Sequence, residues 1–431
     1  MANESNGAPA PERMHALDAV RGFALLLGIV FHATMSFLPT TAQVWVVEDT
    51  HRSTALGVLF FATHVFRMTT FFLIAGFFAH MSFHRLGAGA FVRDRLKRIA
   101  LPLVVAWPLV FGSIIAVSIW AAVTAHGGHL PRTPPPAWPV FPNFPLTHLW
   151  FLYVLLEFYA AALILRGGVA LIDRDGGFRA RVDQLVGLVM RSPFAPVLLA
   201  APVGLAFAAD PKWLMWFGVP APDGSFVTNP TAWIGFGVAF GLGWLLHRQT
   251  ALLQVLERRW ALNLALAIGL IAACLAIAGV APRVTPLPDQ AARLLGAACY
   301  ALAEWTTTFA AVGLALRFLS GFSPVRRYIA DASYWLYIIH LPIVMALQVV
   351  VSRLDWPWPV KFALILAVGF PLMFASYQLL VRHSFIGAVL NGRRAPRKNG
   401  APRKDGVPRR ARLQTQPVSS TPKAAPQEAR R

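Results

Sequence analysis

The sequence predicts an all-α integral membrane protein: a polytopic bundle of about ten transmembrane helices with both termini in the cytoplasm. Composition is the first reason, because the 431-residue chain is 56% hydrophobic and only 13% charged, whereas a soluble domain has roughly 25% charged residues. Long apolar runs are the second reason. Residues 99–124, 260–282 and 362–381 contain no Asp, Glu, Lys or Arg, and each reaches the about 20 residues that cross a bilayer as a helix. Soluble globular, disordered and coiled-coil classes are thereby excluded.

The expected spans are apolar runs bounded by charged residues, proline or glycine. The proline-rich stretch 131–145 is expected to be an irregular segment outside the membrane. The ten expected helices cover residues 17–38, 55–80, 99–124, 146–165, 192–209, 229–246, 260–281, 294–316, 330–351 and 360–381.

Lys and Arg are distributed unequally between alternate loops, and this bias sets the expected orientation. With the N-terminus in the cytoplasm, each inner loop carries three to five Lys or Arg and each outer loop carries one or two. The asymmetry repeats at every crossing. The sequence therefore predicts an even number of spans.

Half of the net charge of +20 lies in one tail, because residues 385–431 hold 12 Lys or Arg against two acids. We expect a cytoplasmic N-terminal tail (1–16), a transmembrane domain (17–383) and a disordered basic cytoplasmic tail (384–431). The basic tail is interpreted as a solvated topology signal or as a contact with anionic membrane lipid. No aromatic or folded binding module accompanies the charge, which argues against nucleic acid.

The two cysteines, Cys274 and Cys299, both fall inside expected spans. They offer neither a disulfide framework nor a metal cluster, so we expect no metal site.

The first span places two polar residues on one helix face. Arg21 and His32 are 11 residues apart, which is three turns plus about 20°, or about 16 Å along the axis. Arg21 would lie at the cytoplasmic mouth and His32 deep in the membrane, where a neutral imidazole accepts a proton. The structural alternatives are a flanking anchor for Arg21 and an interhelical hydrogen bond for His32.

The second span carries His64 and Arg67 one turn apart. A charge near the midplane is costly, so Arg67 is expected either to form an ion pair or to line a polar cavity. The intramembrane acids Glu157 and Glu304 are its candidate partners, with Glu157 preferred.

Basic residues crowd the cytoplasmic entrance of the third span. They are Arg93, Arg95, Lys97 and Arg98. The positive-inside rule explains them, and so would a phosphate-rich cytosolic substrate.

The ninth span carries Ser333, Tyr337 and His340 at positions i, i+4 and i+7, with Pro342 following. These positions share one helix face, so they form either interhelical hydrogen bonds or the wall of a pocket.

Five motifs, occurring in order over residues 17–344, resemble those of the acyltransferase 3 family of integral membrane proteins. They are the Arg21-x10-His32 pair, FFLIAGFFAH (71–80), RLKRIALP (95–102), HLWFLYVLLEFY (148–159) and SYWLYIIHLPIV (333–344). Segments 17–32, 66–78 and 148–152 look most like a branch of that family thought to add succinyl groups to periplasmic glucans.

The resemblance implies a multi-pass O-acyltransferase of a bacterial inner membrane that moves an acyl group from cytosolic acyl-CoA to a sugar or glucan hydroxyl. It implies no permanently bound cofactor, and the partners are acyl-CoA, the acceptor, membrane lipid and a possible second copy of the chain. His32 and Arg21 would be the catalytic pair, with His32 as general base and Arg21, Arg95 and Arg98 facing the CoA phosphates. Arg67, Tyr337 or His340 would stabilise the oxyanion. The residues expected to contact substrate are His64, Arg67, Arg95, Arg98, Glu157, Ser333, Tyr337 and His340.

Two other classes of function stay open on the sequence. One is a secondary transporter with His32, Arg67, Glu157 and Glu304 along its pathway, although no inverted repeat of interrupted helices is evident. The other is a non-catalytic partner in envelope polysaccharide assembly. An assay of CoA release separates the enzyme from both.

Overall fold

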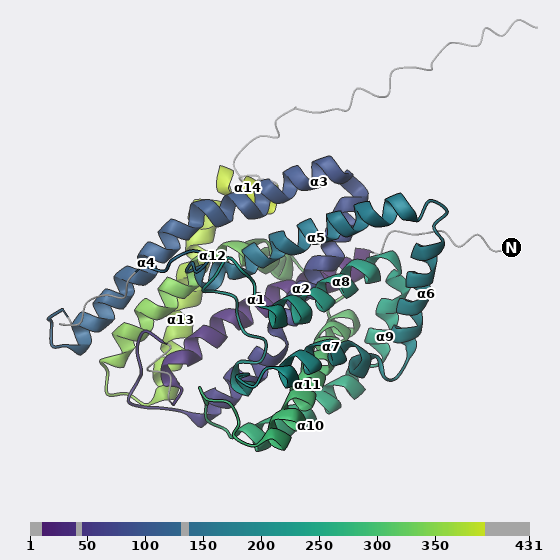
Figure 1. Ribbon diagram of the computed structural model, residues 1–431. Helices are drawn as coiled ribbons and strands as arrows, with labels where there is room; N and C mark the ends of the chain where they lie inside the picture. The colour runs from purple at the N-terminus through teal and green to yellow at the C-terminus, as the bar shows by residue number, and fades with distance from the viewer. Residues whose placement is uncertain (1–10, 40–44, 131–137, 393–431) are drawn as a thin grey trace, which may run out of the picture. The chain divides into compact units, whose positions relative to one another are not determined.

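The computed structural model describes residues 11–39, 45–130 and 138–392. The described residues form helices and connecting segments without a β-strand, as Figure 1 shows. The predicted all-helical class is confirmed.

Every predicted span is helical. The corresponding helices are α1 (Pro11–Thr34), α2 (Thr54–Leu86), α4 (Leu101–Ala125), α5 (Trp150–Ile172), α7 (Ala195–Ala209), α8 (Pro230–Arg248), α10 (Trp260–Ala278), α11 (Gln290–Phe318), α12 (Pro324–Ser352) and α13 (Trp358–Ser376). Three shorter helices lie between them, α3 (Ala88–Arg95), α6 (Gly177–Arg191) and α9 (Leu253–Arg258), and a fourth, α14 (Phe385–Asn391), follows α13. A π-helical turn, Leu96–Ala100, carries α3 directly into α4.

By the criteria of length and hydropathy, the described residues contain fewer candidate membrane spans than the predicted ten. Eight helical segments in the described residues meet both, and nine do if α6 and α7, bent by 104°, count as one broken span. The helix α8 is not among them. The predicted location of both termini in the cytoplasm stays a prediction.

Helical structure extends beyond the predicted transmembrane domain (17–383) at both ends. The helix α1 begins at Pro11, inside the predicted N-terminal tail (1–16), and α14 lies inside the predicted disordered tail (384–431). The apolar sequence FIGAVLN, capped by the Ser384 hydroxyl, accounts for α14. The remaining tail residues lie outside the described part of the chain.

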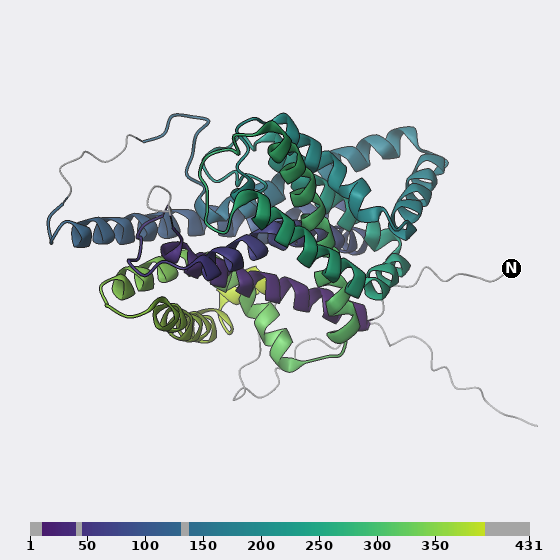
Figure 2. The same cartoon turned by 90° about the horizontal axis from the view of Figure 1, so that it is seen from below.

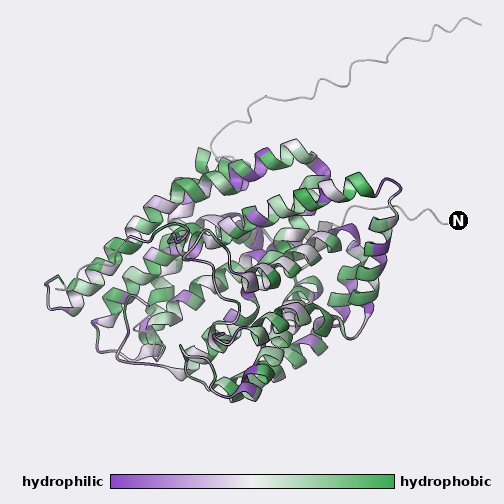
Figure 3. Ribbon diagram, viewed as in Figure 1, coloured by the Kyte–Doolittle hydropathy of each residue, from purple (hydrophilic) through white to green (hydrophobic). Residues whose placement is uncertain are grey.

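The outer faces of several helices are apolar. On α4, for example, Val104 and Leu109 are 71% and 69% exposed. Figure 3 shows hydrophobic residues along most helices. Exposed apolar faces of this extent are what a bundle needs when its solvent is lipid.

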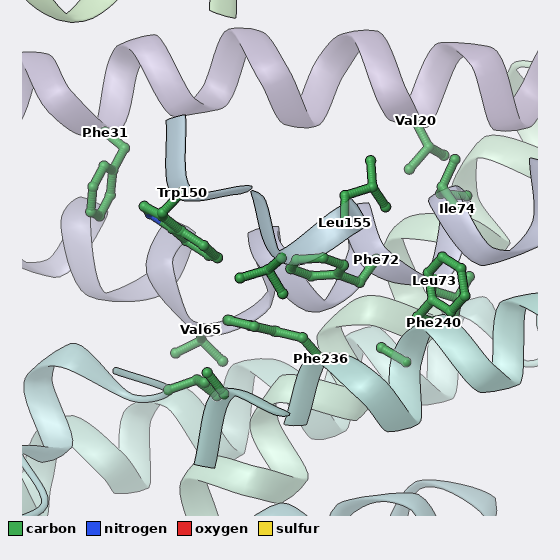
Figure 4. Close-up of a cluster of buried hydrophobic side chains, with 14 of the residues drawn as sticks. Val20, Phe31, Val65, Phe72, Leu73, Ile74, Trp150, Leu155, Phe236 and Phe240 are labelled. Atoms are coloured by element: carbon green, nitrogen blue, oxygen red, sulfur yellow. The ribbon is translucent and has the colours of Figure 1, made fainter. Parts of the chain in front are cut away.

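An aromatic layer around α2 forms part of the core. The ring of Phe72 lies 4.7 Å from that of Phe236 and 5.3 Å from that of Phe158, measured between ring centroids, and Figure 4 shows Phe72 against Phe236 and Leu155. The phenylalanine-rich segment of α2 therefore fixes α5 and α8 against the helix that carries His64 and Arg67.

Glycines let α2 and α8 approach backbone to backbone. A Cβ added at Gly243 would clash with the carbonyl of Leu73, and one added at Gly76 would clash with the carbonyl of Phe240. Small residues at helix crossings are a common device of membrane bundles.

We expect Gly243→Ala to destabilise the protein by roughly 1–3 kcal/mol, the usual cost of overpacking a close contact. Gly241→Ala is the matched control on the same helix, since a Cβ there meets nothing within 4 Å. Thermal unfolding in detergent measures both. Equal melting temperatures would contradict the close approach of α2 and α8.

Candidate functional site

A cavity of about 1240 Å³ runs along the middle of the bundle. Its lining residues extend from Asp18 on α1 to Met35 directly after it, and on α2 from Phe60 to Arg85. At 1.5 Å per residue these stretches are about 25 Å and about 37 Å long. Figures 1 and 2 show α1, in purple, in the middle of the bundle. The cavity thus joins regions near opposite ends of the helices.

The cavity brings together nine of the ten predicted site residues. They are Arg21, His32, His64, Arg67, Arg95, Arg98, Ser333, Tyr337 and His340. The continuous helix α1 presents Arg21 and His32 to the same space, as their spacing predicted. The stripe on α12 lines the cavity, and its Tyr337 hydroxyl also makes a hydrogen bond to another segment, the carbonyl of His148, so both interpretations of the stripe apply.

The tenth predicted residue, Glu157, does not line the cavity. Its carboxylate accepts a hydrogen bond from the hydroxyl of Thr228 at 2.8 Å. This hydrogen bond between Thr228 and Glu157 links α5 to the segment before α8, so Glu157 has a structural contact there.

One end of the cavity is rich in arginine. Five arginines line it there, Arg21, Arg85, Arg95, Arg98 and Arg327. Three carboxylates lie beside them: Asp18 is 3.2 Å from Arg21, Asp94 is 2.9 Å from Arg98, and Asp331 is 3.3 Å from Arg327. The last turn of α14 also lines this mouth. The mouth has a surplus of positive charge suited to a polyanion.

Deeper in the cavity, the imidazoles of His32, His148 and His340 lie close together, and that of His32 is the one without a hydrogen bond. Neither of its ring nitrogens has a hydrogen-bond partner among the described residues, and its Nδ1 is buried. The centroid of its ring lies 5.1 Å from that of His340, which in turn lies 4.9 Å from that of His148. No three His, Cys, Asp or Glu side chains in the described residues are grouped as metal ligands. His32 thus lines the cavity without a hydrogen bond from its ring to a described residue.

The other two imidazoles are held by backbone carbonyls. His340 donates from Nδ1 to the carbonyl of Tyr337 at 2.7 Å, and His148 donates from Nε2 to the same carbonyl at 3.1 Å. These donations fix one tautomer of each ring. His148 is the first residue of the motif at 148–159, but no sequence pattern marked it as a site residue.

His64 lies beside this group. Its Nε2 donates to the carbonyl of Phe217 at 2.8 Å, and its ring stacks on Phe31 and Phe60 with centroids 5.3 and 5.6 Å away. The stacking and the hydrogen bond fix the ring in the cavity wall.

Arg67 is buried, at 8% exposure, and lines the same part of the cavity. Its guanidinium carbon lies 4.2 Å from the centroid of the Phe31 ring, and Gly28 leaves room for it, because a Cβ there would come within 2.7 Å of Nη1. It forms no ion pair with any described residue, and its Nε is unpartnered.

The predicted ion pair between Arg67 and an intramembrane acid is therefore wrong. Glu157 bonds Thr228, and Glu304, fully buried, accepts a hydrogen bond from Thr69 instead. The Arg67 cation instead faces the electron-rich ring of Phe31 and the cavity, where a carboxylate was expected.

Comparison with known proteins places this geometry in context. A family model described as an acyltransferase domain matches residues 14–378. The glucans biosynthesis protein C of Shigella dysenteriae serotype 1 is 31% identical over 159 residues, which are 35% of this chain and 38% of that protein. The protein of the same name from Escherichia coli is 30% identical over 159 residues, with the same coverage. The matched region spans less than two fifths of these curated relatives, and no solved structure matches the chain.

Proposed function

The chain belongs to the acyltransferase domain family, and from this premise we propose that it moves an acyl group from cytosolic acyl-CoA to a hydroxyl of an envelope glycan. The names of the relatives support the glycan acceptor, since they are glucan biosynthesis proteins. The one observation that carries the proposal is the unpartnered imidazole of His32 in a cavity with an arginine-lined mouth.

The mouth would bind the polyanionic part of the donor. Arg21, Arg95 and Arg98 present guanidinium groups, which pair with phosphate through charge-assisted hydrogen bonds. Between Arg21 and His32 the cavity wall includes the apolar Leu25 and Ala75. A pantetheine arm lying along this wall would carry the thioester toward His32, about 16 Å further along α1.

The reaction then needs a base. His32 would take the proton of the acceptor hydroxyl while that oxygen attacks the thioester carbonyl. When the tetrahedral intermediate collapses, the carbon–sulfur bond breaks and the imidazolium returns the proton to the sulfur of CoA. An ester of the acceptor and free CoA are the products, and the atoms balance without another reactant.

Arg67 is the residue best placed to stabilise the oxyanion of the intermediate. The Tyr337 hydroxyl already donates to the carbonyl of His148 at 2.7 Å, and the His340 Nδ1 already donates to Tyr337. Arg67 alone among these three candidates has donors without a partner in the described residues. A buried, preorganised cation is the kind of group that stabilises developing negative charge.

We further propose a succinyl group as the acyl group. The proposal rests on the resemblance of segments 17–32, 66–78 and 148–152 to a branch thought to succinylate periplasmic glucans. The cationic cavity also favours an acyl group that ends in a carboxylate over a neutral one of similar length.

The decisive experiment measures CoA release by the purified protein in lipid nanodiscs. Succinyl-, acetyl- and butyryl-CoA are supplied with and without a periplasmic glucan, and the glucan is analysed by mass spectrometry for added acyl groups. We expect acceptor-dependent CoA release, fastest with succinyl-CoA. Folded protein that releases no CoA from any donor would overturn the proposal, and glucan uptake into proteoliposomes without CoA release would indicate a transporter.

We expect Arg21→Ala to weaken acyl-CoA binding about 10- to 100-fold, the loss of one charge-assisted contact of about 1.5–3 kcal/mol. Arg21→Lys should restore the affinity only in part, since an ammonium lacks the guanidinium fork. Arg93→Ala is the control, because Arg93 lies in the same basic segment as Arg95 but does not line the cavity. Affinity is measured by titration of a nonhydrolysable acyl-CoA, and equal affinities for all three variants would contradict the assignment of the mouth.

A further inference from the structure

We propose that Gln348 and Trp45 are positioning residues that hold the imidazole of His32 for the reaction. This inference rests on the proposed role of His32 as general base. It adds a support built from three separate parts of the chain, the end of α1, the segment that follows it and the helix α12.

Gln348 ties α12 to the last turn of α1. Its side chain is fully buried, and its Nε2 donates to the carbonyls of His32 at 3.0 Å and of Ala33 at 3.2 Å. Carbonyls in the last turn of a helix have no partner within that helix. Gln348 therefore caps α1 from the side and fixes the backbone that carries His32.

The other end of the same amide holds Trp45. The Oε1 of Gln348 accepts a hydrogen bond from the indole Nε1 of Trp45 at 2.9 Å. This bond sets the indole nearly parallel to the His32 ring, with an interplanar angle of 11° and centroids 5.8 Å apart. One glutamine thus orients both the backbone of His32 and the ring stacked on its imidazole.

Stacking has an unusual share in orienting His32. A catalytic histidine is ordinarily oriented by a hydrogen bond to the ring nitrogen that does not react. Neither nitrogen of His32 has such a partner among the described residues. Its neighbours contact it through rings instead: Trp45 is stacked, and Phe31 is edge-on at 5.0 Å.

The segment that carries Trp45 is itself anchored. Asp49 accepts from the Lys361 ammonium at 2.8 and 2.9 Å, in a pair whose side chains are 1% and 0% exposed. The backbone N–H groups of Asp49 and Ser53 donate to the carbonyls of Ser36 and Phe37, both at 2.8 Å. These contacts hold the segment that follows Trp45 against α13 and against the turn directly after α1. They therefore limit the movement of the backbone next to Trp45.

Three variants separate the parts of this support. Gln348→Met keeps the length of the side chain and removes both hydrogen-bonding functions. Trp45→Phe keeps an aromatic ring and loses the N–H donor, and Trp45→Leu loses the ring. Each is compared with the parent protein at equal amounts of monodisperse, folded protein.

Two readouts are measured, single-turnover acyl transfer and the rate at which diethyl pyrocarbonate modifies His32, followed by mass spectrometry on unliganded protein. We expect Gln348→Met and Trp45→Leu to lower the transfer rate roughly 10- to 100-fold, in line with the cost of misplacing a reacting group by about 1 Å. The KM for acyl-CoA should stay within about two-fold, and Trp45→Phe should fall between. Modification of His32 should accelerate, because a stacked face is uncovered.

The matched control is Trp335→Phe. Trp335 makes the same kind of bond, from its indole Nε1 to the Ser376 hydroxyl at 2.9 Å, between α12 and α13 and outside the cavity. It should alter neither the transfer rate nor the modification of His32. Unchanged transfer and unchanged modification in Gln348→Met and Trp45→Leu would overturn the proposal. Faster modification of His32 in a protein that shows no acyl transfer would support the positioning and reject the proposed reaction.

Discussion

His32→Ala is expected to lower the rate of acyl transfer about 10²–10⁴-fold, the usual loss when a general base is removed. The affinity for acyl-CoA should stay within about two-fold, because the arginine-lined mouth lies about 16 Å away along α1. Single-turnover transfer and acyl-CoA titration, both at matched folded protein, measure the two effects separately.

His84→Ala is the control for this experiment, since His84 lies near the C-terminal end of α2 and does not line the cavity. Its transfer rate should match that of the parent. If His32→Ala retains near-normal transfer, the base is another imidazole. His340 would then be tested first, because its ring centroid is 5.1 Å from that of His32.

The relation between Arg21 and His32 was predictable because one continuous helix determines it. Eleven residues on α1 fix both the shared face and the axial separation, and the structure has both side chains in one cavity. The stripe of Ser333, Tyr337 and His340 on α12 was predictable for the same reason. The face that a residue occupies on a helix follows from the sequence of that helix alone, whichever elements pack against it.

The surroundings of these residues depend on how the helices pack, and the sequence patterns do not reveal that packing. The turn that carries His148, directly before α5, packs on α12, and Gln348 of α12 in turn contacts the last turn of α1. A buried arginine predicted a carboxylate partner on energetic grounds, but the structure surrounds Arg67 with the Phe31 ring and the cavity. The sequence indicates that such a charge needs compensation and leaves open which group supplies it.

Arg67→Met is expected to lower the rate of transfer about 10²–10³-fold, the usual loss of one oxyanion donor. The amount of folded protein and its melting temperature should stay equal or rise. Methionine removes a buried charge and leaves no carboxylate unpaired, whereas breaking a buried ion pair strands its partner. Arg67→Lys should recover part of the rate, because it returns the charge without the fork of donors. Thermal unfolding and single-turnover transfer test both halves of this expectation.

Arg248→Met shows what the loss of a paired arginine does in the same bundle. Arg248 donates to both carboxylate oxygens of Asp183, at 2.8 and 2.6 Å, so its removal leaves an acid without its partner. We expect this variant to unfold at a lower temperature than the parent while its transfer rate per folded molecule is retained. If Arg67→Met loses as much stability as Arg248→Met does, and its activity falls with the loss of folded protein, Arg67 has a structural role. A stable but slow Arg67→Met protein would assign the cation to binding a ligand, because no described residue accepts a hydrogen bond from the Arg67 guanidinium.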